Sequence, residues 1–307
     1  SEITSKLPAA PVEFETDGSK VIVTCGSSKF SLLTMAVEGY PNLPEIPEQT
    51  GVVAADAFTT SVQQVVVAAS RDDVTPMLTG VLIEATQKSI SLIASDRYRV
   101  ALKEIPWKSN LGATTISAVI PSRTLAEIAK TFANQGEISI SITSQDDREM
   151  IAFQANNRSV TSILIRGNFP AVKTLFPEKL DNFAVVSTSE LIESTRRVSL
   201  VLERESPLRF TFEPDSISLV ATGNETAQAS ESIAADLTGK EIVVSLKPPF
   251  LLDGLAGIQG EYVRIGFTNN ENPGKPGPIL ISSQSAKDKS DLDTYRYLLQ
   301  PNLLPPR

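Results

Sequence analysis

Hydrophobic residues recur with a helical period in two segments near the middle of the chain. The first apolar face consists of Phe58, Val62, Val65, Val66 and Ala69. The second consists of Leu125, Ile128, Ala129 and Phe132. Both spacings place their members on one side of a helix. The second helix is expected to begin near Pro121-Ser122, with the proline in its first turn and the serine as N-cap.

Alternating polar and apolar positions predict strands around these helices. Residues 81–84 and 89–94 alternate on either side of the polar turn Gln87-Lys88, which predicts a hairpin. Further strands are expected at 138–143, 150–154 and 160–166. The same order then returns: the capping box 187–190 opens a helix through Leu191, Thr195, Val198 and Leu202. Strands at 208–212 and 217–221, a helix over 249–255, and strands at 262–267, 279–283 and 295–299 follow.

Segments of the sequence also repeat at a domain-sized spacing. The run Ser89-Ile90-Ser91-Leu92-Ile93-Ala94-Ser95 returns 127 residues later as Ser216-Ile217-Ser218-Leu219-Val220-Ala221-Thr222. At the same spacing, Pro121, Leu125 and Ile128 return as Pro248, Leu252 and Leu255. Residues 23–41, ending Gly39-Tyr40-Pro41, align with residues 153–170, ending Asn168-Phe169-Pro170. A spacing of this length indicates repeated domains rather than the short units of a solenoid.

The repeat predicts three units with an α+β fold, each complete unit having two helices packed on antiparallel sheets. We expect residues 1–50 to be the C-terminal part of a first domain, residues 51–177 a central domain and residues 178–307 a C-terminal domain. Only about fifty residues precede the second unit, so the first is expected to be cut short. The proline-bearing segments 42–47 and 175–178 are interpreted as linkers.

The composition excludes most catalytic and metal chemistry. The 307 residues contain no histidine and one cysteine, Cys25. Histidine-based acid–base catalysis, catalytic triads, Cys-pair zinc sites and intrachain disulfides are therefore ruled out. No glycine-rich nucleotide-binding motif is present, and we expect no cofactor. Asp72-Asp73, Asp146-Asp147 and residues 288–291 are interpreted as solvated loop charges, with a metal or acid–base pair as the alternative.

The formal net charge of −8 argues against general binding to nucleic acids, but it does not exclude a local basic surface. Several cations lie on the predicted helices, and helix faces in one plane would give a positive track along a phosphate backbone. The alternative is an ordinary solvated face, since Glu127 and Glu193 lie on the same helices. The lone cysteine, the mean hydropathy near zero and the absence of a signal peptide or a long apolar run favour a soluble protein of the cytoplasm.

Several motifs together resemble one protein family. They are the run Arg71-Asp72-Asp73-Val74, residues 76–81 (Pro-Met-Leu-Thr-Gly-Val), residues 94–101 (Ala-Ser-Asp-Arg-Tyr-Arg-Val-Ala), residues 167–170 (Gly-Asn-Phe-Pro) and residues 294–301 (Thr-Tyr-Arg-Tyr-Leu-Leu-Gln-Pro). In this combination the chain resembles the bacterial DNA polymerase III beta subunit, the sliding clamp, over essentially its whole length. That family has three similar domains per subunit, and the chain resembles a clamp that lacks roughly the first half of domain one.

The resemblance implies a non-catalytic processivity factor. Two subunits would form a head-to-tail homodimer, each an arc of domains, closed into a ring around double-stranded DNA without reading its sequence. Helices would line the hole and sheets would form the outer wall, with only loose contacts to the phosphates. The residues expected to line the DNA are Lys6, Arg71, Arg123, Lys130, Arg196 and Arg197.

The resemblance also implies a groove between the second and third domains. It would bind short apolar peptides from the DNA polymerase III catalytic subunit, the clamp loader and repair polymerases. The expected groove residues are Leu78, Ser95, Arg97, Arg99, Val100, Pro170, Leu175, Leu298, Gln300 and Pro301. A buried leucine or phenylalanine anchor would contribute about 1.5–3 kcal/mol. Without the resemblance, Leu78, Val100 and Leu298 would be interpreted as core residues.

Two features depart from the family pattern. The family usually ends in a Met-Pro-x-Arg-Leu type of run, whereas this chain has Gln300-Pro301-Asn302-Leu303-Leu304, and Lys247 stands where an amide is common. We hypothesise that the groove has altered chemistry, with a shifted partner preference or resistance to an inhibitor that binds there.

Ring closure in the family joins the first domain of one subunit to the third domain of the other. The matching residues are Phe30 and Leu32 on one side and Leu200 and Val201 on the other. For a chain this short we expect an impaired or strained dimer. Two alternatives stay open: a divergent clamp-like module that binds peptides without encircling DNA, and an unrelated α+β enzyme.

Overall fold

The computed structural model describes residues 2–40, 45–143, 149–203, 206–223, 227–268, 276–287, 289–290 and 294–303. The chain divides into two compact units, Ser1–Glu45 and Ile46–Arg307. The predicted loop pair Asp146-Asp147 lies outside the described residues, as do Asp288, Asp291 and the chain from Leu304 onward.

The first unit is a three-stranded antiparallel sheet with one short helix. Its elements are α1 (Glu2–Lys6), β1 (Val12–Asp17), β2 (Lys20–Cys25), β3 (Ser28–Leu33) and the 3-10 turn η1 (Val37–Gly39), with strand order β1-β2-β3. Val23 and Cys25 are buried, whereas Phe14 and Leu33 are exposed. The Cys25 thiol lies 3.4 Å from the Pro8 and Ala10 carbonyls. This unit therefore buries only a small apolar core of its own.

The second unit contains two repeats of one series of elements. The central repeat, residues 51–175, consists of β4 (Gly51–Ala54), α2 (Ala55–Val66), η2 (Pro76–Thr79), β5 (Gly80–Ala85), β6 (Ser89–Ser95), β7 (Arg99–Pro106), β8 (Lys108–Ser109), β9 (Ile116–Pro121), α3 (Ser122–Phe132), β10 (Glu137–Thr143), β11 (Met150–Ala155), β12 (Arg158–Ile163) and η3 (Val172–Leu175).

The C-terminal repeat, residues 183–299, follows the same order. It consists of β13 (Phe183–Ser187), α4 (Thr188–Val198), η4 (Ser199–Val201), β14 (Leu208–Glu213), β15 (Ser216–Thr222), β16 (Gln228–Thr238), β17 (Ile242–Leu246), α5 (Pro248–Ala256), β18 (Tyr262–Phe267), β19 (Ile279–Ala286), β20 (Lys289–Ser290) and β21 (Arg296–Leu299).

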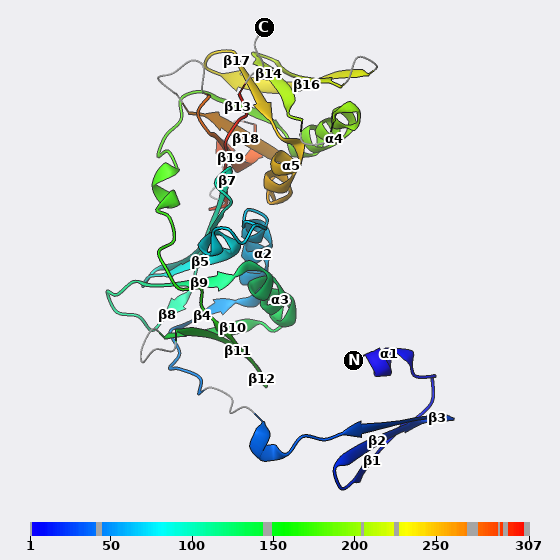
Figure 1. The fold of residues 1–307 in the computed structure, drawn as a ribbon. Helices are drawn as coiled ribbons and strands as arrows, with labels where there is room; N and C mark the ends of the chain where they lie inside the picture. Colours follow the sequence, from blue (N-terminus) through cyan, green and yellow to red (C-terminus); the bar gives the residue numbers. More distant parts are fainter. Residues whose placement is uncertain are drawn as a thin grey trace. The chain divides into compact units, whose positions relative to one another are not determined.

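Strand order confirms that the two repeats share one topology. In the central repeat, β9-β5-β6-β7 and β12-β11-β10-β4-β8 are neighbours in that order. In the C-terminal repeat, the order β17-β14-β15-β16 continues as β16-β13-β18-β19-β21. The long strand β16 thus occupies both positions that β7 and β8 fill separately in the central repeat. Figure 1 shows the paired helices, α2 beside α3 and α4 beside α5, on these sheets.

The first unit repeats the last part of this topology. In the β2–β3 hairpin Val23 opposes Phe30, and in the β11–β12 hairpin Phe153 opposes Val160, 130 residues further on. Both turns contain a residue with a left-handed backbone, Gly26 at φ +57° and Asn156 at φ +52°. The expected tandem repeat of α+β units, with two helices on antiparallel sheets in each complete unit, is confirmed.

One sheet joins the two repeats. Strand β21 pairs with β19 of its own repeat and with β7 of the central repeat, so that Leu298 lies opposite Val100 and Leu299 opposite Arg99. The result is a single 13-stranded sheet that runs from β17 to β9. Backbone hydrogen bonds, rather than side chains alone, therefore hold the two repeats together.

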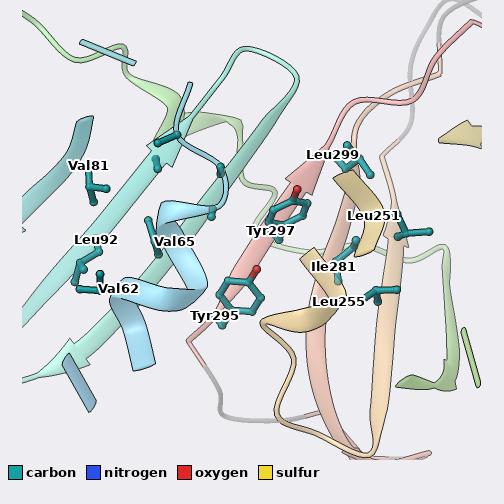
Figure 2. Close-up of a cluster of buried hydrophobic side chains, with 14 of the residues drawn as sticks. Val62, Val65, Val81, Leu92, Leu251, Leu255, Ile281, Tyr295, Tyr297 and Leu299 are labelled. Atoms are coloured by element: carbon teal, nitrogen blue, oxygen red, sulfur yellow. The ribbon is translucent and has the colours of Figure 1, made fainter. Parts of the chain in front are cut away.

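A shared hydrophobic core lies between the sheets and the helices. In Figure 2, Val62 and Val65 of α2 lie near Val81 and Leu92 of the central sheet. Tyr295 and Tyr297 belong to the same cluster, beside Leu251 and Leu255 of α5. Both tyrosines are completely buried.

Four predictions of element bounds were wrong in detail. Helix α2 ends at Val66, so Ala69, predicted on its apolar face, lies beyond the helix. The cap of α3 is Pro121, not Ser122, because Pro121 still pairs with Gly80 in β9 while Ser122 is already helical. Helix α4 ends at Val198 rather than reaching Leu202, since the chain turns through η4. Strand β12 ends at Ile163, three residues early, because Ile165 bonds to the Val119 carbonyl instead. The capping serine Ser187 is confirmed, with its hydroxyl accepting from the Glu190 N–H.

We predict that Gly254→Ala destabilises the protein. Alanine favours a helix by about 1 kcal/mol over glycine, but here its Cβ would lie 2.6 Å from two ring carbons of the fully buried Tyr297. The free energy of unfolding should fall by about 1–3 kcal/mol, as for other overpacked cores. Urea denaturation followed by circular dichroism measures it. The matched variant Gly112→Ala has open space around the new Cβ and should be neutral; equal stabilities for both variants would contradict the packing argument.

Candidate functional site

A second, smaller apolar cluster lies on the joined sheet where the two repeats meet. Its buried members are Ile93, Val100, Leu102, Phe176 and Leu298, and Leu82, Phe169, Val172 and Leu280 pack against them. Strands β6 and β7 supply three of these residues, and β21 supplies Leu298. We call this set the junction cluster. Two of the predicted groove residues, Val100 and Leu298, are thus brought together as cross-strand neighbours.

The segment that links the two repeats packs on this cluster. Phe176 is buried in it, and the Arg296 guanidinium lies 5.0 Å from the centroid of the Phe176 ring. Leu175 and Pro170, both predicted groove residues, remain exposed, with Leu175 57% accessible. Lys173 forms an ion pair of 3.0 Å with Glu84 of β5. The linker therefore carries exposed apolar side chains beside an apolar cluster.

The turn between β6 and β7 carries three more predicted residues in a fixed arrangement. The Ser95 hydroxyl donates to the Arg99 carbonyl at 2.9 Å and accepts from the Arg97 N–H at 3.3 Å. Arg97 is exposed, has a left-handed backbone at φ 79°, and donates to the Thr75 hydroxyl. Leu78 is buried in η2 beside this turn, and its N–H donates to the Thr75 carbonyl.

The C-terminal segment follows on from β21 along this turn. The Gln300 N–H donates to the Tyr98 carbonyl at 2.8 Å, and the Gln300 amide donates to the Pro276 carbonyl at 2.9 Å and, more weakly, to Pro301 at 3.4 Å. Pro301 is buried, and the Asn302 N–H donates to the Ser245 carbonyl. Gln300 therefore does not extend freely from the strand end, because its side chain is tied to a neighbouring loop.

Arg99 precedes Val100 on β7, so its side chain lies on the opposite face of the sheet from that predicted groove residue. Only 6% of its side chain is accessible, and its guanidinium bonds to Asp96 at 2.8 Å, to Asp253 at 2.6 Å and to the Tyr297 hydroxyl at 3.3 Å. Burial acts to lower the pKa of Arg99, but Tyr297, Asp253 and Asp96 outweigh it and hold the pKa above its ordinary value. For Tyr297 the effect is the opposite, since burial disfavours the phenolate and raises the pKa of the hydroxyl. The pair therefore stays a cation and a neutral phenol at physiological pH.

Sequence reasoning missed the aromatic residues beside this turn. Tyr98, 62% accessible, stacks on Phe250 of α5 with ring centroids 6.3 Å apart. The Lys247 ammonium lies 5.7 Å from the Phe250 centroid, and the Arg99 guanidinium carbon lies 4.3 Å from it. Phe250 lies in a predicted helix and Phe176 in a predicted linker. Periodicity alone does not show that Phe250 meets Tyr98 or that Phe176 meets Ile93, because these partners are distant in the chain.

An open pocket of about 470 Å³ lies beside the junction cluster and shares Leu82 and Phe169 with it. Its rim also carries Glu84 and Glu149. The Glu84 carboxylate is paired with Lys173 and the Glu149 carboxylate lies 3.8 Å from Arg166. This pocket has mixed polarity, in contrast to the junction cluster.

The predicted DNA-lining cations differ in their surroundings. Lys6 ends α1 in the first unit, and in the second unit Arg71 follows α2, Arg123 and Lys130 lie on α3, and Arg196 and Arg197 lie on α4; all six are exposed. Lys130 is paired with Glu127 at 2.7 Å, and Arg197 binds Glu231 at 2.6 Å and Glu193 at 3.5 Å. The hydrogen bond to Glu231 raises the pKa of Arg197, and that from Arg197 lowers the pKa of Glu231. Within the described residues, Arg71, Arg123 and Arg196 form no ion pair.

The residues predicted at the dimer interface all lie at strand edges or turns. Leu200 and Val201 form η4, and Leu200 is 84% accessible. Phe30 and Leu32 lie on β3, an edge of the sheet of the first unit, with Leu32 exposed. No cluster of three or more potential metal ligands occurs in the described part of the chain, and no helix there is long and apolar enough to cross a membrane.

Comparisons with known proteins agree with this architecture. The family models of the DNA polymerase III beta subunit match residues 1–44 (N-terminal domain), 52–171 (central domain) and 173–292 (C-terminal domain). The beta sliding clamp of Streptomyces coelicolor is 39% identical over 302 residues, which covers 98% of this chain and 79% of that protein. The beta sliding clamp homolog GriR of Streptomyces muensis is 36% identical over 301 residues, with the same coverage of both chains.

A solved structure shows the same likeness. The DNA polymerase sliding clamp of Bacillus subtilis superimposes with a TM-score of 0.85 at 28% identity, and the match covers 99% of this chain and 78% of that one. The predicted resemblance is thereby confirmed. The chain belongs to the DNA polymerase III beta subunit family, the beta sliding clamps, which are non-catalytic polymerase processivity factors.

Proposed function

We propose that two copies of this chain close into a ring around duplex DNA and tether DNA polymerase III and other partners through a groove at the junction cluster. The observation that carries the proposal is the β7–β21 pairing, which brings an apolar cluster and exposed linker side chains together on one face of a continuous sheet. We keep residues 1–50, 51–177 and 178–307 as the proposed domain bounds.

Repeat symmetry supports ring closure by strand pairing. At the junction of the two repeats, the first half of β7 receives β21. The equivalent of β7 is β16, and its residues 228–234 pair on one side with β15, while within the described chain only residues 235–238 pair with β13. The equivalent of β21 is β3, because β3 pairs with β2 as β21 pairs with β19. The edge of β16 in one copy is therefore the proposed partner of β3 in the other.

The same equivalence gives the register of this proposed pairing. Ser95 opposes Val100, and Thr222 opposes Gln228, so Gln228 is the equivalent of Val100. Ile279 is the equivalent of Ile151 in the central repeat, and Val21 lies 130 residues before Ile151, so Val21 and Ile279 are equivalent. Val21 opposes Leu32 and Ile279 opposes Leu299, so Leu32 is the equivalent of Leu299 and Phe30 of Tyr297. The Leu298–Val100 pair then becomes Ser31–Gln228 between subunits, and the Tyr297–Ala101 pair becomes Phe30–Ala229. The exposed Leu200 in η4 packs beside β16 and would be covered.

We predict that Leu200→Asp prevents dimerisation, because a buried unpaired carboxylate at the proposed interface is strongly unfavourable. Multi-angle light scattering over a dilution series should give the 33.0 kDa mass of one chain for the variant and twice that mass for the parent protein. Val74→Asp, also at an exposed apolar position, should leave the mass unchanged.

Paired cysteines test the register. Phe30→Cys combined with Ala229→Cys should form a disulfide between subunits under mild oxidation, whereas Phe30→Cys with Ser230→Cys should not, because neighbouring residues of a strand face opposite sides. A parent protein that is monomeric at all concentrations, or crosslinking in the second pair only, would refute this mode of closure.

Helix cations support a loose contact with DNA. Arg71, Arg123 and Arg196 are exposed and unpaired within the described residues, whereas Lys130 and Arg197 are held by carboxylates. A sparse set of free cations attracts the phosphates without fixing the protein at one position. Such a contact suits a ring that must slide.

We predict that Arg123→Gln with Arg196→Gln weakens binding to duplex DNA and lowers its salt dependence. The slope of log K against log salt should decrease by about 0.9 for each phosphate that the protein no longer neutralises. Fluorescence anisotropy with a labelled duplex at several salt concentrations measures it. Lys130→Gln with Arg197→Gln removes cations that are already neutralised and should have a smaller effect; the reverse order of effects would contradict the assignment.

We predict that Leu175→Ser weakens partner binding without affecting stability. Leu175 is exposed in the free protein, and its burial by a peptide would contribute about 1.5–3 kcal/mol, so its loss should weaken affinity roughly ten- to hundredfold. Isothermal titration with a synthetic peptide that carries adjacent leucine and phenylalanine anchors measures the affinity. Val220→Ser, on β15, is the matched control and should bind as the parent does.

The departure at Gln300 can be tested in the same titration. Its amide is engaged by the Pro276 carbonyl, so Gln300→Met would replace a tied polar group with a flexible apolar one. Tighter binding by the variant would support the hypothesis of altered groove chemistry. Equal affinities of Gln300→Met and the parent protein would refute that hypothesis.

A further inference from the structure

Arg99 is bound by side chains from three different elements around the junction of the repeats. Asp96 lies in the turn before β7, Asp253 and Phe250 lie on α5, and Tyr297 lies on β21. The guanidinium donates to both carboxylates and to the Tyr297 hydroxyl, and the Tyr297 hydroxyl donates onward to the Phe250 carbonyl at 2.8 Å. One buried cation thus connects a turn of the central repeat with a helix and a strand of the C-terminal repeat.

The two faces of the paired strands β7 and β21 carry different side chains. Arg99 and Tyr297 lie on the side of the helices, whereas Val100 and Leu298 lie on the other side, in the junction cluster. Side chains alternate along a strand, so any shift of β21 against β7 would move both sets together. The ionic contacts on the helix side therefore fix the relative position of the two apolar residues on the other side.

Equivalent positions in the C-terminal repeat carry no such group. By the register above, Arg99 corresponds to Ala227 and Asp96 to Gly223. The arginine is thus an addition to the common fold at the one junction that carries the junction cluster. A second contact across the same junction supports this rigidity, since the buried Gln64 amide of α2 donates to the Gly257 carbonyl at 2.7 Å.

We propose that Arg99 is a positioning residue for the partner-binding groove, one that touches no partner and acts by locking β21 and α5 against β7. The inference rests on the proposed function, because it assigns to Arg99 the task of preforming the groove. A site whose supporting groups are fixed in advance loses less entropy when it binds. Removing Arg99 would leave Asp96 and Asp253 without the cation between them and loosen the junction.

Three variants test the lock. Arg99→Met removes the charge at similar length, Arg99→Lys keeps the charge but loses the planar fork, and Asp253→Asn changes the far side of the contact at a side chain that is 39% accessible. Arg209→Met, at an exposed arginine of β14, is the matched control. The full chain is used throughout, with hydrogen–deuterium exchange for the junction and the same anchor peptide for affinity.

Arg99→Met and Asp253→Asn are each expected to speed exchange in residues 99–102 and 296–300 and to weaken peptide affinity by about tenfold, with Arg99→Lys between them and the parent. The double variant Arg99→Met, Asp253→Asn should lose little more affinity than either single variant, because both substitutions break the same Arg99–Asp253 contact. The exchange of β14 and β15 should not change. If Arg99→Met fails to fold, Asp253→Asn and Arg99→Lys carry the test.

Three results would overturn the proposal. Unchanged exchange at the junction would show that Arg99 locks nothing, and faster exchange with unchanged affinity would show that the lock does not shape the groove. An affinity loss in Arg99→Met but not in Asp253→Asn would indicate direct contact with the peptide. A parent protein that binds no peptide would instead refute the proposed function itself, a result distinct from variants that bind as well as the parent.

Discussion

The pairing of β7 with β21 is the constraint on which the rest of the second unit depends. Four residues of each strand make it, and through it two sheets of separate repeats become one. Backbone pairing fixes spacing and register, which side-chain packing between domains does not. Everything near the candidate groove is then placed by it: the apolar pair Val100 and Leu298 on one face, the buried Arg99 and Tyr297 on the other, and Gln300 at the strand end.

A repeat that joins its neighbours by strand pairing must have two complementary sheet edges, one for each neighbour. In this fold they are the first half of the β7-type strand and the outer side of the β21-type strand, and within the second unit one of each is used internally. The remaining β16 edge alternates between exposed and covered residues and includes Glu231, which is tied to Arg197. Charge near a free edge is a common protection against unspecific strand addition. A strand edge that can accept a partner strand but has a charged residue nearby suits a reversible and specific junction.

Much of the fold could be predicted from the sequence because its signals are local. The helical spacing of Phe58 to Val65 and the serine cap at Ser187 depend on neighbours in the chain, and both were confirmed. Strands β7, β13, β16 and β17 were not predicted, since their residues lack a clear alternation or a turn signal. The candidate site was harder still. Val100 and Leu298 look like core residues by pattern, and nothing local shows that Arg99 meets Asp253, 154 positions away.

Arg99 also shows how a family resemblance can place a residue and still leave its role open. A cation at a binding groove is expected to face the ligand, yet here desolvation, two carboxylates and a phenol hold it in the interior. Burying a charge is costly and is offset only by good geometry, so a buried ionic contact is weak evidence of added stability. In a protein without catalytic groups, the arrangement itself is the function. A clamp works by keeping surfaces at fixed positions, and a β7–β21 junction held by backbone pairing on one side and by Arg99 on the other fits that requirement.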